Sequence, residues 1–355
     1  MLDLAAHAGA LTAALVDVES VSGDETRLAD LVEAALRRYP SLAAERDGNV
    51  VLAHTSLGRS ERVVLAGHLD TVPIADNLPS RVEGDLLHGC GTADMKSGLA
   101  VLLRIAHLVG AQALNPRVDL TWVCYDCEEV DAARNGLGRL ARTRPEALRA
   151  DLAILLEPTH GVVEGGCQGT LRALVRTTGV RAHPARSWLG VNAIHAAAPV
   201  LARLVAYEPR GVDVDGLTYR EGLNAVAIAG GVAGNVIPDE CTVTVNFRFA
   251  PDRSEADAAQ HVRAVFDGFE VDVVDSAPAA RPGLDAPLPR SVVAAVGGEP
   301  RAKLGWTDVA RFGELGIPAL NFGPGDPNLA HKPEEHVELS RVAEAEAALV
   351  RFLSR

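Results

Sequence analysis

Apolar residues follow two patterns in the first part of the chain. Leu28, Leu31, Val32 and Leu36 recur at helical spacing, and the first forty residues therefore predict two helices. Four other runs are almost continuously apolar, as is typical of strands buried on both faces of a sheet: 63–66, 118–125, 152–156 and 319–322. A helix-spaced stretch, 97–109, separates the first two runs. Strands that alternate with helices predict an α/β domain with a mostly parallel sheet.

The middle of the chain, from Gly169, has a different order of elements. Its pattern predicts strand, helix, strand, strand, helix and strand, at 171–177, 192–207, 224–229, 242–249, 254–266 and 270–274. This order is that of a ferredoxin-like α+β sandwich. Pro199 lies inside the first predicted helix, where proline is unfavourable. The stretch 276–289 contains four prolines and predicts a linker. We therefore expect a catalytic α/β domain, 1–168 and 281–355, interrupted by a smaller domain, 169–280.

Composition excludes several classes of function. The chain of 355 residues is 48% hydrophobic and 23% charged, as in folded soluble proteins. Its net charge of −13 comes from 47 acidic and 34 basic residues with no run of like charge, so we expect no nucleic-acid partner. The uncharged stretch 223–238 is too short and too rich in glycine to cross a bilayer. No basic residue precedes the N-terminal apolar run, so we expect a cytoplasmic protein without membrane contact.

Five cysteines, at 90, 124, 127, 167 and 241, bear on redox and metal chemistry. An odd number without an export signal predicts reduced thiols. Cys124 and Cys127 form a C-x-x-C, which is compatible with half of a zinc knuckle or with a redox pair. The chain has no second C-x-x-C, and this one follows a strand-like run instead of opening a helix. We therefore favour buried, neutral cysteines over a functional dithiol or a structural zinc.

Histidines and carboxylates collect just after the four predicted strands of the larger domain. In chain order they are His68, Asp70, Glu128, Glu129, Glu157 and His331. Asp94 lies just before a predicted helix and could point to the same place. In open α/β sheets, ligands bind beyond the carboxyl ends of the strands. Each residue alone is more often structural, but buried acids and imidazoles are costly together unless they are paired or bind a metal. Spacing alone therefore leaves a metal centre and a structural role both open.

Five motifs, in this order, carry a family resemblance: GHLDTVP (67–73), GCGTADMKSG (89–98), CEEVDAARNGLG (127–138), LLEPT (155–159) and AHKPEEHVEL (330–339). They resemble those of the di-zinc aminoacylase/carboxypeptidase amidohydrolases, and the resemblance covers nearly the whole chain, including the inserted domain. Within that family, four further stretches are most similar to the succinyl-diaminopimelate desuccinylases of actinobacterial type. These are GGCQGT (165–170), AGNVIPDE (233–240), VNFRF (245–249) and GWTDVARF (305–312).

The resemblance implies a site for two zinc ions per chain, with cobalt as a possible substitute. It implies that His68 and Glu157 hold one zinc, that Glu129 and His331 hold the other, and that Asp94 bridges them. Imidazole and carboxylate are suitable zinc ligands, and a site that keeps a water is catalytic.

The resemblance also assigns the proton chemistry. Asp70 would accept the second ring N–H of His68 and fix its orientation. Two zinc ions lower the pKa of a shared water to about 7, and Glu128 would act as general base toward it. In relatives a histidine of the smaller domain, supplied by the other subunit of a dimer, stabilises the oxyanion. The matching position here is His183, and His195 is the competing candidate.

The family resemblance says less about the residues that bind the substrate and set its specificity. The resemblance proposes Asn235, Arg248, Thr307, Arg311 and Gly323 for a substrate with several carboxylates. Arg248 has an ordinary alternative as a salt-bridged strand arginine, and Gly323 as part of a turn. The chain also departs from many family members, with cysteine where they have arginine (position 90) or aspartate (position 127). The stretch 304–306 replaces a glycine run of some desuccinylases. These departures touch the substrate loops but remove no implied ligand or base.

The function implied is zinc-dependent hydrolysis of N-succinyl-L,L-2,6-diaminopimelate to succinate and L,L-diaminopimelate, on the route to lysine. The expected assembly is a homodimer formed through the inserted domain. An acetylornithine deacetylase, or another N-acyl-amino-acid hydrolase or carboxypeptidase of the family, is the neighbouring alternative. A non-catalytic metal-binding relative is the alternative from another class. It would be marked by loss of the base or of a ligand, and all six positions are present.

Overall fold

The computed structural model describes residues 1–354, which form two compact units. The sheet unit consists of 1–165, 282–301 and 308–354, and the inserted unit consists of 166–281 and 302–307. We predicted the borders at 168/169 and 280/281. The short segment 302–307, which we expected in the larger domain, groups by its contacts with the inserted unit. No helix within 1–354 is long and apolar enough to cross a membrane.

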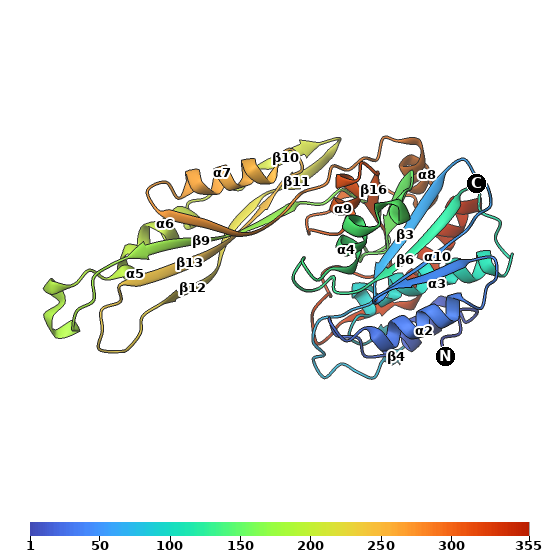
Figure 1. Cartoon of the computed structure of the whole chain (residues 1–355), viewed down its shortest axis with the longest axis horizontal. Helices are drawn as coiled ribbons and strands as arrows, with labels where there is room; N and C mark the ends of the chain where they lie inside the picture. Colours follow the sequence, from blue (N-terminus) through green and yellow to red (C-terminus); the bar gives the residue numbers. More distant parts are fainter. Residues whose placement is uncertain (355) are drawn as a thin grey trace. The chain divides into compact units, whose positions relative to one another are not determined.

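The sheet unit is built on a mixed sheet of eight strands, which confirms the predicted α/β class. In spatial order the strands are β1 (Ala43–Asp47), β2 (Val50–His54), β6 (Asp119–Tyr125), β3 (Arg62–His68), β7 (Leu152–Leu155), β16 (Ala319–Asn321), β8 (Glu164–Gly165) and β15 (Arg301–Ala302). The four central strands, β6, β3, β7 and β16, run parallel (Figure 1). They are the four strands predicted from the apolar runs, and their carboxyl ends lie at one edge of the sheet.

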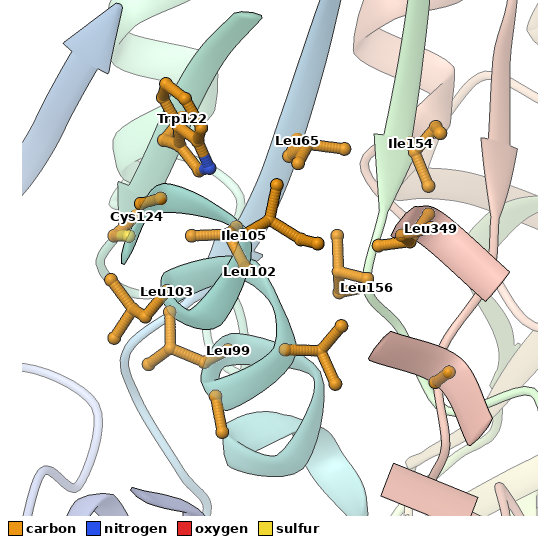
Figure 2. Close-up of a cluster of buried hydrophobic side chains, with 14 of the residues drawn as sticks. Leu65, Leu99, Leu102, Leu103, Ile105, Trp122, Cys124, Ile154, Leu156 and Leu349 are labelled. Atoms are coloured by element: carbon orange, nitrogen blue, oxygen red, sulfur yellow. The ribbon is translucent and has the colours of Figure 1, made fainter. Parts of the chain in front are cut away.

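Seven helices pack around this sheet: α1 (Ala8–Val16), α2 (Thr26–Leu36), α3 (Ser97–Gly110), α4 (Gly136–Thr143), α8 (Pro287–Val296), α9 (Val309–Glu314) and α10 (Leu339–Ser354). The central helix α3 is almost wholly buried because apolar residues surround it on nearly every side. Figure 2 shows Leu102 and Ile105 of α3 packed toward Leu65 and Trp122 of the sheet. A small sheet of β4 (Arg81–Glu83), β5 (Leu86–His88) and β17 (His336–Glu338) completes the unit.

The inserted unit has the predicted ferredoxin-like order. Its main elements are β9 (Gly169–Thr178), α5 (Ala193–Ala196), α6 (Ala198–Val205), β12 (Gly222–Gly230), β13 (Glu240–Phe249), α7 (Glu255–Val265) and β14 (Glu270–Ala277). The strands form an antiparallel sheet in the order β12-β13-β9-β14. The single helix predicted for 192–207 is two helices, because proline is tolerated in the first turn of a helix but not in its interior, and Pro199 lies in the first turn of α6. A hairpin of β10 (Gly211–Val214) and β11 (Leu217–Arg220) was not predicted.

Candidate metal centre

The carboxyl ends of the parallel strands bring the predicted site residues of the sheet unit together. His68 is the last residue of β3, and Glu128 and Glu129 begin three residues after β6. Glu157 follows β7 by two residues, and the loop after β16 carries His331. Parallel strands place these ends side by side, so residues distant in sequence meet at one edge of the sheet.

Asp94 lies between two groups of candidate ligands. One potential ligand atom from each of His68, Asp94 and Glu157 lies within 4.8 Å of the others, and the same holds for Asp94, Glu129 and His331. Oδ1 of Asp94 lies 3.1 Å from Nε2 of His68, while Oδ2 lies 3.6 Å from Nε2 of His331. The same Nε2 of His331 lies 2.9 Å from Oε1 of Glu129. The two oxygens of one carboxylate therefore face two separate ligand groups.

Asp70 fixes the orientation of the His68 ring by contacting Nδ1, while Asp94 faces Nε2. Nδ1 of His68 lies 3.0 Å from the carbonyl oxygen of Asp70 and 3.4 Å from its Oδ1. Burial lowers the pKa of His68, but the contacts with Asp70 and Asp94 outweigh it and raise the pKa well above its usual value. Burial raises the pKa of Asp70, but His68, Ser22 and the amide of Glu128 outweigh it and hold the pKa at about 2. Asp70 is therefore an ionised carboxylate that directs Nε2 toward Asp94.

The loop after β6 separates the two adjacent glutamates. Cys127 has a φ of 57°, in the left-handed region, and the amides of Glu128 and Glu129 donate to Oδ1 and Oδ2 of Asp70, each at 3.0 Å. Glu129 reaches His331. Burial raises the pKa of Glu128 well above its usual value, and the acidic neighbours Glu157, Asp308 and Glu129 add to this against the opposing effect of His68. A carboxyl group of raised pKa beside the ligand groups is suited to accept and return a proton.

A scan of family models matches Peptidase family M20/M25/M40 over residues 64–355, which is more than half of the chain. The chain belongs to this M20 peptidase family. It is 59% identical over 356 residues to a putative succinyl-diaminopimelate desuccinylase, DapE, from Mycobacterium tuberculosis, with 99% of each chain covered. It is 50% identical over 361 residues to the succinyl-diaminopimelate desuccinylase of Corynebacterium glutamicum, with 99% of this chain and 98% of the relative covered.

Solved structures support the M20 fold. A tripeptidase from Staphylococcus aureus superposes with a TM-score of 0.81 at 19% identity, covering 100% of this chain and 98% of the other. A dinuclear metal-binding M20 peptidase from Bacillus subtilis superposes with a TM-score of 0.72 at 16% identity, covering 98% and 96% of the two chains. The resemblance read from the motifs and the predicted fold class are confirmed at the level of the family and the fold.

The donor set of the M20 chain fits divalent metal ions. Four carboxylates, those of Asp94, Glu128, Glu129 and Glu157, share the edge of the sheet with two imidazoles. So many acids at a partly buried site repel one another unless cations neutralise them. Carboxylate oxygen and imidazole nitrogen are donors that zinc, cobalt and manganese accept. The arrangement can therefore hold two such ions with Asp94 between them.

Sequence reasoning missed Glu335, which holds the Asp94 loop in place. Its carboxylate is buried and accepts the amides of Gly91 at 3.0 Å, Ala93 at 2.8 Å and Asp94 at 3.0 Å. Burial raises the pKa of Glu335 to about 7 against the lowering effect of these amides. The residue stands in the AHKPEEHVEL motif, but nothing in its spacing shows that it binds backbone amides. Its only sequence signal is its place four residues after His331.

The predicted substrate residues of the sheet unit have structural partners. The Arg311 side chain is mostly buried, and its Nε donates to Asp308. A Cβ on Gly323 would lie 2.5 Å from the carbonyl oxygens of Leu156 and Glu157, so only glycine fits there. Gly323 packs closely against the backbone of the Glu157 loop, and this contact alone explains why glycine stands at position 323.

The other four predicted residues belong to the inserted unit. Thr307 is buried and accepts the thiol of Cys167 on its carbonyl oxygen. Arg248 lies half-buried on β13, and within residues 1–354 no salt bridge engages it, so the ordinary alternative of a paired strand arginine is not what the structure has. Asn235 is exposed between β12 and β13. His183 is exposed and its Nδ1 accepts the amide of Ala185 at 3.1 Å.

All five cysteines are free and buried, in agreement with the interpretation as neutral thiols. Burial raises the pKa of Cys124 to about 12. Burial and the neighbouring Glu25 raise the pKa of Cys127 to about 12. Both members of the C-x-x-C are therefore protonated at neutral pH.

Proposed function

We propose that this M20 enzyme is a zinc-dependent amidohydrolase that converts N-succinyl-L,L-2,6-diaminopimelate to succinate and L,L-diaminopimelate. The observation that carries the reaction is Asp94, whose two oxygens face His68 and His331 beside the partly buried Glu128. The substrate rests on the identity along the full chain to two relatives that are named as desuccinylases of this compound. The free, buried cysteines accord with a reducing cytoplasm as the place of action.

The metal ligands of the proposal are the residues that meet at the edge of the sheet. His68 and Glu157 would hold one zinc, Glu129 and His331 the other, and Asp94 would contribute one oxygen to each. When bound, the two ions would polarise the amide carbonyl and lower the pKa of a bound water. Cobalt offers a substitute because it accepts the same donors.

Glu128 would move the proton in the reaction. As the water oxygen attacks the amide carbon, the Glu128 carboxylate takes a proton from that water. When the C–N bond breaks, the same carboxyl group gives the proton to the leaving nitrogen, so the amine departs neutral. Burial raises the pKa of Glu128 above its usual value, which makes the carboxylate a better proton acceptor for the first transfer.

His183 would stabilise the oxyanion from a second copy of the chain. Its Nδ1 accepts the amide of Ala185, so the neutral ring carries its proton on Nε2. Nε2 is then a hydrogen-bond donor, which an oxyanion requires. His195 on α5 is also exposed, but no such contact fixes its tautomer among the described residues. His183 is therefore the better donor of the two.

The second copy would dock through the inserted unit. Strand β12 lies at the edge of its sheet, and seven of its nine residues are exposed. Val226 is 59% exposed and Ile228 52% exposed, and the strand carries no charge that would prevent pairing. An uncharged, apolar edge strand with unpaired amides and carbonyls is a template for another strand. A homodimer would pair it with the same strand of the partner.

Substrate carboxylates would be bound mainly by Arg248. It is half-buried without an acidic partner in residues 1–354, and burial lowers its pKa, so a substrate carboxylate that paired with it would offset the loss of hydration. Asn235 would contribute an exposed amide. Thr307, Arg311 and Gly323 complete the proposed contacts, with Arg311 acting while paired to Asp308.

The test is amine release by the zinc-loaded protein, with N-succinyl-L,L-diaminopimelate and N-acetylornithine measured side by side. We expect a strong preference for the succinyl substrate and a loss of about 10²–10⁴-fold in kcat in Glu128→Gln, with two zinc ions retained. The exposed Glu334→Gln serves as the control and should keep full activity. Preference for the acetyl substrate would instead make the chain a deacetylase with the same base. Full activity of Glu128→Gln would remove Glu128 from the mechanism.

A further inference from the structure

Three consecutive amides of the loop after β6 are held by two buried carboxylates. Asp70 accepts the amides of Glu128 and Glu129, each at 3.0 Å. The amide before them, that of Cys127, donates to Oε1 of Glu25 at 3.2 Å. The general base of the proposed reaction therefore stands between a contact made by Asp70 and one made by Glu25.

Glu25 is an unusual residue at its position. It comes just before α2 and is fully buried, yet its side chain does not cap that helix. Its Oε1 also accepts the amide of Gly23 at 2.7 Å and lies 3.4 Å from Sγ of Cys127. Its Oε2 is buried and has no hydrogen-bond partner within residues 1–354. A buried carboxylate is unfavourable unless its contacts compensate for lost water, and here most of those contacts lead to Cys127.

Cys127 itself needs such contacts. Its φ of 57° lies in the left-handed region, where a residue with a Cβ is strained. That conformation turns the chain between β6 and the two glutamates. Strained backbone persists only where the surroundings hold it, and it occurs often at functional sites.

We propose that Glu25 and Cys127 form a positioning pair for the catalytic loop, in which Glu25 accepts both the amide and the thiol of Cys127 and thereby sets the direction of Glu128. The pair rests on the proposed function, because it acts through Glu128 as general base. Neither residue touches the reacting atoms. Glu25 holds the amide of Cys127 and Asp70 holds the next two, so the two carboxylates restrain different amides of the same loop.

A bound cation is the alternative explanation for this cluster, because ligand atoms of Glu25, Asp126 and Cys127 lie within 4.8 Å of one another. Asp126, however, already faces the guanidinium of Arg139 at 3.4 Å. The Sγ–Oε1 separation of 3.4 Å is that of a thiol donating a proton to a carboxylate. We therefore assign a proton, not a metal, to the space between Glu25 and Cys127, and metal content decides between them.

The test compares Cys127→Ala, which removes the thiol donor, with Cys127→Ser, which restores a donor. Cys124→Ala is the matched control, because Cys124 is a buried thiol three residues earlier that makes no polar side-chain contact within residues 1–354. In the zinc-loaded protein we expect Cys127→Ala to lower kcat about tenfold with KM nearly unchanged, because a base displaced by a fraction of an ångström transfers protons poorly. Cys127→Ser should recover most of the loss, and both should keep two zinc ions per chain.

Two further measurements distinguish a loss of loop positioning from a general loss of stability. Amide hydrogen exchange in the peptide around 127–129 should be faster in Cys127→Ala than in Cys124→Ala, and it needs no substrate. In a Glu25→Gln background, Cys127→Ala should cost clearly less in kcat than it does alone, since residues in contact are not additive.

Each outcome decides the proposal. Equal kcat and equal exchange in Cys127→Ala and Cys124→Ala would overturn it, as would additive effects with Glu25→Gln. Loss of a third bound metal in Cys127→Ala or Glu25→Gln would replace it with a cation site. A wild-type protein inactive on every acylated amino acid would remove the proposed function, whereas the exchange measurement would still decide whether Glu25 and Cys127 hold the loop.

Discussion

The buried carboxylate of Glu335 accepts the amide of Asp94 at 3.0 Å, although 241 positions separate the two residues in the chain. The same carboxylate accepts the amides of Gly91 and Ala93. His331 lies four residues before Glu335, so this acid connects the loop of one candidate ligand with the loop of another. The geometry in which Asp94 faces both His68 and His331 depends on that connection.

Glu335→Gln should therefore weaken metal binding. Glutamine has one acceptor oxygen, while Glu335 uses both of its oxygens for three amides, so at least one amide would face an NH₂ group. Loss of a contact that orients a ligand typically lowers metal affinity about 10–100-fold. Titration with a competing chelator measures this affinity. The exposed neighbour Glu334→Gln is the control, and equal affinity of the two variants would contradict the prediction.

The metal-free protein should lose stability as pH rises. The pKa of Glu335 is raised from 4.5 to about 7, so its contribution is present below 4.5 and is lost as pH rises to about 7. Hydrogen bonding to Glu129, against burial, raises the pKa of His331 from 6.5 to about 9, so its contribution is lost as pH rises through about 9. Both groups therefore lower the free energy of unfolding as pH rises.

Thermal unfolding between about pH 5 and pH 8 should therefore give a falling Tm without metal, and the range stops there because the pKa of buried Lys96, lowered to about 8, has the opposite effect at higher pH. With zinc bound, the ligands are already deprotonated and metal affinity increases with pH, so the gap in Tm between the two forms should widen. Glu335→Gln should flatten the fall below about pH 7 in the metal-free protein. A metal-free Tm that rises over this range would be incompatible with these shifts.

Much of the fold could be predicted from the sequence because its strongest patterns are local. The continuous apolar runs of β3, β6 and β7 belong to strands buried on both faces, and their ends placed His68, Glu128 and Glu157 at one edge. Short edge strands such as β10 and β11 carry no such pattern. Pro199 indicated a break in the helix, but only the structure shows where α6 begins.

The contacts that support the candidate site were harder to predict for a physical reason. Glu25 and Glu335 act by accepting backbone amides from segments about a hundred or more positions away. An amide has the same chemistry at every residue except proline, so the sequence holds no signal of which carboxylate it will meet. Ligand types and strand ends identify a metal centre, whereas the residues that hold its loops appear only in three dimensions.

Ile228→Lys should separate the proposed dimer into monomers. The side chain is 52% exposed on β12, and a lysine ammonium at an edge strand opposes pairing with a second strand. Light scattering coupled to gel filtration measures the mass directly. Val82→Lys is the control, since Val82 is 57% exposed but belongs to β4 of the sheet unit. A dimer that persists in Ile228→Lys and is lost in Val82→Lys would place the interface elsewhere.

Mixing two inactive variants should restore activity if His183 acts on the partner's site. His183→Ala should still bind two zinc ions but lose most turnover, and Glu128→Gln should be inactive for want of a base. A mixed dimer contains one site with an intact Glu128 and, from the other chain, an intact His183. Random exchange of subunits then gives about a quarter of the wild-type activity, because half of the dimers are mixed and each has one complete site. Mixing with Ile228→Lys in both chains is the control and should give no recovery. Unchanged kcat in His183→Ala would remove this histidine from the reaction, and no recovery on mixing would place its action within its own chain.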